Sequence, residues 1–452
     1  MSTDTFSPPD LLDSLLDHCR KAGADAADAR ISVSEGVSVD VREGKLESVE
    51  RAESQGVSLR CFFGRRQAHV SGSDLSAGAL AGLAERCVAM ARAVPEDPWC
   101  GLATPDELAR EDRDLDLEGD GEVAEETLEA EALAAEAAAL AIDEVRMTSG
   151  CSAGWTRAER WLAASNGFAA HRRGSFSGLG LAVVAERDGR MERDYESRSV
   201  RYREDRPAPE EIGRIAGERA AARLGPRRIS TQKAAVIYDR RVAPSLLGPL
   251  IGAISGPSVA RGVSFLKDRL GEKVFADGVD IVDDPFRRRG LGSRLHDGEG
   301  RPVETVKLIE DGVLTRWLLN GSSARQLGLA PNGHAGLGFG DPPGVSTSNL
   351  YLAAGRDTPG ALMKAAGRGL LVTDMFGPSI NPNTGDYSVG VSGFWFEDGE
   401  IVHPVSEVTI AGDLPAMYAR LVPASDLEFR GSNDAPSILI EDMSIAGDRV
   451  ED

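Results

Sequence analysis

The chain has 452 residues and a formal net charge of −21, with 72 acidic residues against 51 basic ones. This length suits two or three domains with cores of ordinary size. The excess of acid disfavours nucleic acid and anionic membrane surfaces as partners, because both are bound through clustered Lys and Arg.

The N-terminal part predicts a compact unit of two helices and several short strands. Asp10–Gly23 carries one apolar stripe, which is typical of an amphipathic helix, and a second helix is expected near Ser76–Ala93. Between them, glycine-bearing turns at EG, EGK and QG are expected to separate the strands. The predicted strands are Ala29–Ser34, Val37–Arg42, Leu46–Ala52 and Val57–Phe63.

Pro95–Gly121 breaks this pattern with Pro, Asp, Glu and Gly, and is expected to be an exposed connection. The next segment, VAEETLEAEALAAEAAALAIDEV, favours a helix by propensity, with its acids on a solvated face. A meander with turns at SNG and RDG follows, and a helix over Pro209–Leu224 closes this half of the chain. The expected strands of the meander are Thr148–Ala153, Trp155–Ala163, Ser175–Glu186 and Arg190–Arg201.

The second half opens with a buried strand, AAVIYD, and an apolar stretch from Val242 to Leu266 that Gly and Pro divide into two helices. Beyond it the pattern is β-rich. Hairpin turns are expected at the two EDG sequences, Glu310–Gly312 and Glu397–Gly399.

These patterns together predict an α+β protein. An N-terminal α/β region of short antiparallel strands with helices is followed by a β-rich C-terminal domain. The main boundary is placed near Arg228, which divides the chain into residues 1–228 and 229–452, with a sub-boundary near 95–121.

The sequence contains no self-contained catalytic motif. A hydrolytic zinc site commonly places two His one helical turn apart beside a Glu, and none of the six His has that spacing. A GxSxG nucleophile turn is also missing.

The five cysteines include no CxxC pair and are expected to be reduced. The sequence begins without a signal-peptide pattern and contains no apolar run of membrane-spanning length, so we expect a cytoplasmic location.

Acids and a histidine gather in the stretch SINPNTGDYSVGVSGFWFEDGEIVHPVSEVTIAG. Its EDG hairpin predicts that Glu397 and Asp398 face water, and His403, which precedes a proline, is typical of an edge strand. Asp386 is expected to be a turn carboxylate. An alternative interpretation keeps Asp386, His403 and Glu407 as an atypical catalytic or metal site.

Four pieces of the chain, in order, resemble the TldD/PmbA family and specifically its PmbA (TldE) branch. They are EGKLESVERAESQGVSLRCFFGRRQAHVSGSDLS, GSRLHDGEGRPVETVKLIEDGVLTRWLLNGSSARQLG, LLVTDMFGPSINPNTGDYSVGVSGFWFEDGEIVHPVSEVTIAGDL and APSILIEDMSIAGD. The resemblance implies a heterodimer in which a TldD subunit holds zinc through an HExxxH helix and a Cys near its C-terminus. Such a heterodimer cleaves unfolded peptides and leader peptides.

This chain departs from the family's zinc pattern at both places. LLGPLIGAISGPSVARG stands where HExxxH would lie, and no Cys follows Cys151. The resemblance therefore implies no catalytic, cofactor or metal residue in this chain, and zinc in a TldD-like partner. Two other functions stay open: a homo-oligomeric binding or scaffold protein, which would homodimerise without the partner, and a peptidase with an atypical site of its own.

We expect this chain to contribute a wall of the peptide channel. An extended peptide can add to an exposed strand edge through backbone hydrogen bonds, which suits sequence-tolerant cleavage. NTGDYSVGVSG offers small residues and an alternating pattern for such an edge. The expected channel edge consists of Thr384, Gly385, Asp386 and Ser388.

Overall fold

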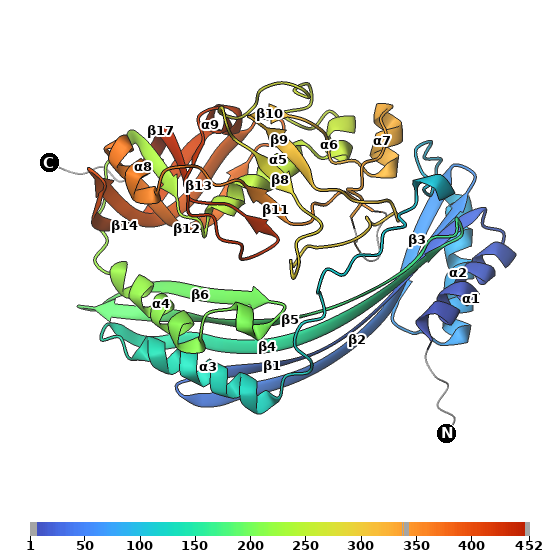
Figure 1. Ribbon diagram of the computed structural model, residues 1–452, viewed down its shortest axis with the longest axis horizontal. Helices are drawn as coiled ribbons and strands as arrows, with labels where there is room; N and C mark the ends of the chain where they lie inside the picture. The colour runs from blue at the N-terminus through green and yellow to red at the C-terminus, as the bar shows by residue number, and fades with distance from the viewer. Residues whose placement is uncertain (1–6, 337, 339–342, 448–452) are drawn as a thin grey trace.

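The computed structural model describes residues 7–336, 338 and 343–447. A long, curved sheet with helices on one side forms the first part of the molecule, and a C-terminal body lies over the other, concave side (Figure 1). The mixture of helices and largely antiparallel sheets confirms the predicted α+β class. Over the described part of the chain, no helix combines the length and the apolar character needed to cross a membrane.

The curved sheet is antiparallel, with strand order β3-β2-β1-β4-β5-β6. The predicted meander is present, and its strands turn at the SNG and RDG sequences. The strands are β1 (Ala26–Arg42), β2 (Lys45–Phe63), β3 (Arg66–Gly72), β4 (Val145–Ala164), β5 (Ala169–Arg187) and β6 (Arg190–Val200).

The strands of this sheet are much longer than the sequence predicts. The expected breaks at EG and QG do not exist, because β1 and β2 run through them as paired strands. A Cβ atom at Gly36 would lie 3.0 Å from the carbonyl oxygen of Trp155, so glycine serves the close approach of β1 and β4 rather than a turn. Only the EGK turn forms, with positive φ at Glu43 and Gly44.

Four helices cover the convex face of the sheet, because the apolar side chains of each strand point to that side with a period of two. One pair packs on the end of the sheet nearest β3, and the other pair on the end nearest β6 (Figure 1). The concave face carries no helix in the described part of the chain. The helices are α1 (Pro8–Lys21), α2 (Ala77–Ala93), α3 (Glu125–Leu140) and α4 (Pro209–Ala222).

The acidic segment forms α3 as predicted, but its acids do not all lie on a solvated face. Glu136 is only 1% exposed. Its carboxylate accepts hydrogen bonds from the backbone N–H groups of Glu43 at 3.0 Å and Gly44 at 2.7 Å, and from the hydroxyl of Thr148. A buried carboxylate needs such donors, so Glu136 fastens the β1–β2 turn to α3.

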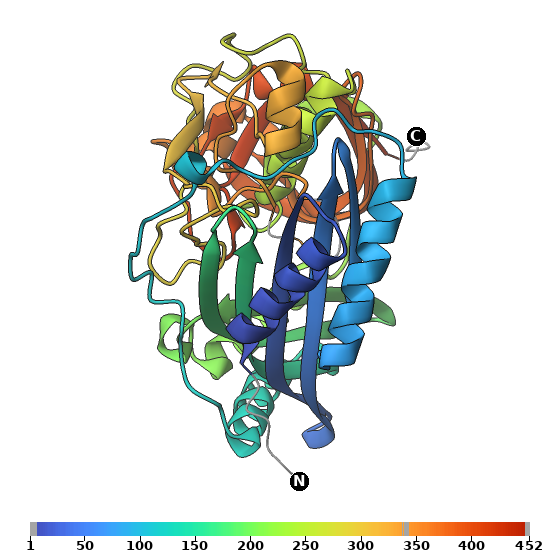
Figure 2. The same cartoon turned by 90° about the vertical axis from the view of Figure 1, so that its right-hand side faces the viewer.

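The connection between α2 and α3 follows the C-terminal body before it returns to α3 (Figure 2). The N–H of Ala109 donates to the carbonyl of Gly300 at 2.8 Å, and Glu107 forms an ion pair with Arg301 at 3.0 Å. The segment Pro95–Gly121 is largely exposed, as predicted, but contacts with Gly300 and Arg301 hold it against the C-terminal body.

The C-terminal body is built on a sheet of order β14-β13-β12-β7-β17-β15, which closes on itself because β14 also pairs with β17. Both predicted EDG hairpins form, and the apolar stretch after β7 divides into short helices as predicted. The strands are β7 (Gln232–Tyr238), β12 (Arg368–Ile380), β13 (Asp386–Glu397), β14 (Glu400–Asp413), β15 (Val422–Pro423) and β17 (Ile438–Ala446).

A smaller sheet of order β10-β9-β8-β11-β16 shares one apolar core with the closed sheet and with α5. Its strands are β8 (Ile281–Asp283), β9 (Val306–Glu310), β10 (Val313–Leu314), β11 (Leu350–Leu352) and β16 (Asn433–Asp434). The helices of the body are α5 (Leu247–Ala253), α6 (Gly256–Ala260), α7 (Gly321–Leu327), α8 (Pro359–Ala366) and α9 (Leu414–Tyr418).

Buried ion pairs on β6 join the two parts of the molecule. Asp194 pairs with Arg241 of the C-terminal body at 2.8 Å, and Glu196 pairs with Arg430. Both carboxylates are buried, so each depends on its arginines for charge compensation. These contacts hold the C-terminal body over the concave face of the curved sheet.

Candidate functional site

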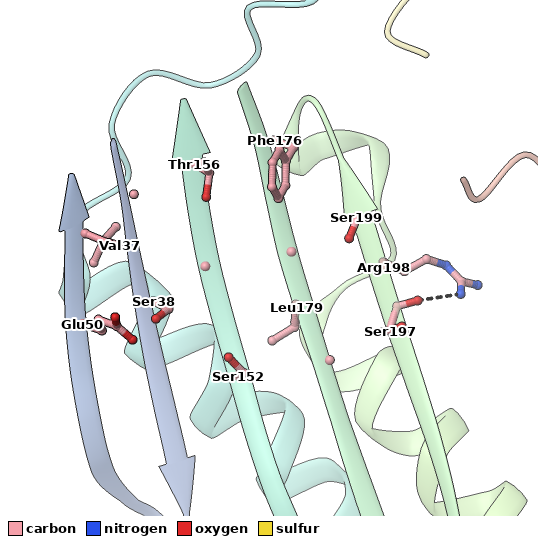
Figure 3. Close-up of a pocket in the computed structure, with 15 residues that line it drawn as sticks. Val37, Ser38, Glu50, Ser152, Thr156, Phe176, Leu179, Ser197, Arg198 and Ser199 are labelled. Atoms are coloured by element: carbon pink, nitrogen blue, oxygen red, sulfur yellow. Dashed lines mark hydrogen bonds between the residues drawn. The ribbon is translucent and has the colours of Figure 1, made fainter. Parts of the chain in front are cut away.

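A trough of about 450 Å³ lies on the concave face of the curved sheet. Five neighbouring strands, from β2 to β6, contribute side chains to it (Figure 3). Phe176 stands at one end and is 43% exposed. The small residues of the trough are Gly36, Ser38, Ala52, Ser152, Gly154, Thr156, Gly178, Gly180, Ser197 and Ser199.

Strand alternation explains why this face is hollow. Trp155 points into the convex core, so its neighbours in β4 point to the concave side. Ser38, Gly154 and Gly178 stand side by side on β1, β4 and β5. A floor of Gly and Ser leaves room above the sheet and offers hydroxyl groups for hydrogen bonds.

The described lining of the trough carries few ionisable side chains. Its described lining residues include no His, Cys or Asp. Glu50 is exposed, and Arg198 is committed to an ion pair with the buried Glu196. We find no nucleophile with an adjacent base among the lining side chains, and such a pair is what covalent catalysis requires.

The described histidines and carboxylates of the C-terminal body are not arranged as zinc ligands. His296 is buried and its Nδ1 lies 2.8 Å from the carbonyl oxygen of Asp297. The Nε2 of His334 lies 3.4 Å from Asp283, and its Nδ1 lies 3.0 Å from Asn332. Across residues 7–336, 338 and 343–447, no group of three or more His, Cys, Asp or Glu side chains is placed to hold a metal ion.

The segment LLGPLIGAISGPSVARG serves as apolar core. Leu247, Leu250 and Ala253 of α5 are buried in the large cluster of the C-terminal body. A Cβ at Gly256 would lie 2.7 Å from the side chain of Leu319, so α6 also packs closely against its neighbours. Gly248 and Gly252 of the same segment are exposed, and no His, Cys, Asp or Glu stands in it.

The predicted open edge at NTGDYSVGVSG is wrong, because β13 is an interior strand. It pairs with β12 on one side and with β14 on the other. Asp386 accepts a hydrogen bond from the hydroxyl of Thr384 at 2.6 Å, and Gly385 is buried against Pro415. The side chains of Thr384 and Asp386 are exposed, whereas Ser388 is half-buried.

Within the described residues, one stretch of the neighbouring strand β12 is paired on one side only. The end of β12 from Phe376 to Ile380 pairs with β13 but not with β7, whose pairing stops at Val372. Phe376 is 48% exposed. Composition gives no sign of this edge, because it follows from where β7 ends relative to β12.

The atypical site around Asp386, His403 and Glu407 is not assembled. Asp386 pairs with Asp413 at one end of β13, whereas His403 pairs with Trp395 near the other end. At about 3.3 Å per residue, the two side chains are roughly 30 Å apart. Glu397 and Asp398 are exposed, as their place in the hairpin predicts.

Comparison with known proteins covers almost the whole chain. Family models described as PmbA/TldA metallopeptidase domain 1, central domain and C-terminal domain match residues 27–91, 118–224 and 231–447. The chain is 37% identical to Metalloprotease PmbA of Escherichia coli O157:H7, over 94% of this chain and 93% of that protein. It is 34% identical to the Metalloprotease PmbA homolog of Haemophilus influenzae, with the same coverage.

Solved structures have the same fold. A putative modulator of DNA gyrase from Bacteroides thetaiotaomicron superposes with a TM-score of 0.90 at 25% identity, over 99% of this chain and 100% of that one. TldE from Thermococcus kodakarensis superposes with a TM-score of 0.86, over 97% of this chain and 100% of that one. At 19% identity, the second likeness concerns the fold alone.

Proposed function

The chain belongs to the PmbA/TldD metallopeptidase family, and we propose that it is the non-catalytic subunit of a heterodimeric zinc peptidase. In this proposal a TldD-like partner holds the zinc, and the heterodimer cleaves unfolded peptides and leader peptides. This chain supplies a wall of the peptide channel and carries no cofactor.

One observation carries the proposal: the place that the family resemblance assigns to HExxxH is filled here by apolar and small residues, with no His, Cys, Asp or Glu. Leu247 and Leu250 are buried in the core of the C-terminal body. The described His, Cys, Asp and Glu side chains do not gather elsewhere into a ligand group. A zinc peptidase needs such a group to acidify water, so the metal chemistry is assigned to the partner.

In this proposal the trough of the curved sheet is the surface on which the subunit holds the peptide. An extended peptide over Ser38, Gly154 and Gly178 would meet backbone and small side chains, which select little by sequence. This fits a substrate class of unfolded chains.

We retain Thr384, Gly385, Asp386 and Ser388 as the proposed channel edge. The peptide would contact their side chains or surface rather than pair with their backbone as an added strand. Because β13 is paired on both sides, a peptide cannot add to it as a further strand. The exposed side chains of Thr384 and Asp386 are the proposed contacts. Unchanged peptide turnover by a complex carrying Asp386→Asn and Ser388→Ala would remove these residues from the proposal.

The proposal is tested by purifying the chain alone and together with a TldD-like partner from the same organism. Zinc content and cleavage of an unfolded peptide are measured in each preparation. We expect both only when the partner is present. Stoichiometric zinc in this chain alone would refute the assignment, and a stable homodimer that ignores the partner would favour the binding or scaffold alternative.

The proposed location of the complex is the cytoplasm. All five cysteines are free thiols, and four of them are buried. Free thiols in this number are typical of reducing compartments.

A further inference from the structure

Two arginines face each other across adjacent strands beside the trough. Arg160 of β4 pairs in register with Arg172 of β5. Like charges directly opposite each other destabilise a sheet. Both side chains, together with Arg201, line a hollow of about 380 Å³ that shares Phe176 and Ser199 with the trough.

The arginines of this hollow bond to neutral oxygens. Arg172 donates to the carbonyl of Ser293 at 2.5 Å. Arg201 donates to the carbonyls of Ser175 at 2.9 Å and Leu291 at 3.0 Å. No described carboxylate lies within ion-pair distance of Arg160, Arg172 or Arg201, although other buried arginines of the chain have one. Arg60, for example, pairs with Asp28, and Arg301 with Glu299.

Among the described residues this positive charge has no carboxylate partner, and part of it is buried, since Arg201 is 8% exposed. The Nε atom of Arg201 and that of nearby Arg294 are buried without a hydrogen-bond partner. Burial, and then the charges of Arg201, Arg160 and Arg294, lower the pKa of Arg172 to about 10. Burying unpaired charge costs stability. The chain has 72 acidic residues, yet none of the described ones pairs with these arginines. The missing counter-charge is therefore expected to come from a ligand.

We propose that this hollow binds a carboxylate group of the peptide substrate. The inference rests on the proposed function in one respect, namely that the ligand is a peptide that continues past Phe176 into the trough. Guanidinium groups present a planar fork that matches a carboxylate in two parallel hydrogen bonds. The carboxylate could belong to the peptide C-terminus or to an Asp or Glu side chain, and the experiment distinguishes the two.

Binding is measured on the isolated chain, without the partner, by ligand-observed NMR at low ionic strength. The probes are N-acetylated tetra-alanine with a free C-terminus, its C-terminal amide, and an amidated analogue with one internal glutamate. Arg160→Gln is the test variant, because Arg160 is exposed and has no described partner, so folding should survive. Arg190→Gln, at the exposed β5–β6 turn, is the matched control.

We expect a carboxylate-bearing peptide to bind, the simple amide not to bind, and Arg160→Gln, but not Arg190→Gln, to weaken binding about tenfold. Binding of the free acid assigns the site to a peptide C-terminus, and binding of the glutamate analogue assigns it to a side chain. No binding, equal binding of all three probes, an unaffected Arg160→Gln variant, or displacement of the peptides by a single-stranded oligonucleotide would overturn the inference. None of these results depends on zinc or cleavage, so failure here leaves the subunit proposal intact.

Discussion

Glu136 is a buried acid whose carboxylate closes the turn between β1 and β2. Glu136→Gln would turn an amide N–H₂ toward backbone N–H donors. We expect a loss of roughly 1 to 3 kcal/mol in the free energy of unfolding, measured by urea denaturation. Glu126→Gln, at an exposed position of the same helix, is the control and should change little. Equal stability of the two variants would contradict this role for Glu136.

His296 is expected to make the fold acid-sensitive. Burial, with the charges of Arg172, Arg294 and Arg30, lowers the pKa of His296 to about 4. An unfolded His titrates near 6.5, so between about pH 6.5 and 4 the unfolded chain binds a proton that the folded chain does not. Stability therefore falls as the pH decreases through this window.

His296→Asn should flatten that dependence. From pH 7 to pH 5 we expect the parent chain to lose roughly 1 to 2 kcal/mol more than the variant, measured as the free energy of unfolding at each pH. His171→Asn, at an exposed position, should keep the sensitivity of the parent because His296 is still present. Identical pH profiles for the parent and His296→Asn would refute the assignment.

At the scale of elements, α3 and α4 approach each other through a glycine. A Cβ at Gly213 would lie 1.9 Å from the carbonyl oxygen of Ala135, closer than atoms can approach. We expect Gly213→Ala to force the helices apart and to cost more than about 1 kcal/mol, measured by thermal or urea unfolding. Gly248→Ala is a matched control in α5, where nothing lies within 4 Å. It should be neutral or slightly stabilising, because Ala favours a helix.

The sequence predicts elements well where the signal is local. The EGK and EDG turns, the helix α2, and the division of the apolar stretch after β7 all follow from neighbouring residues. Gly36 misleads because its role is set by Trp155 on a strand that is distant in sequence. The trough is also non-local, because Gly154 lies beside Ser38 and Gly178 only through the register of three strands.

The arrangement of the whole molecule depends on contacts that composition does not reveal. Asp194 and Glu196 of β6 hold the C-terminal body through Arg241 and Arg430. This places the body over the concave face of the curved sheet (Figure 1). The trough and the arginine-lined hollow are lined mainly by residues of that sheet. Such an arrangement suits a chain that holds a peptide for chemistry performed elsewhere.

The most direct test of this division of labour removes the zinc motif of the partner alone. The chain is co-expressed with a TldD-like partner whose HExxxH histidines are replaced by alanine, and native mass spectrometry counts zinc in the complex while peptide cleavage is assayed. We predict an assembled heterodimer with no bound zinc and no cleavage. Retention of one zinc per heterodimer, or of cleavage, would show that this chain holds a catalytic metal and would contradict the account.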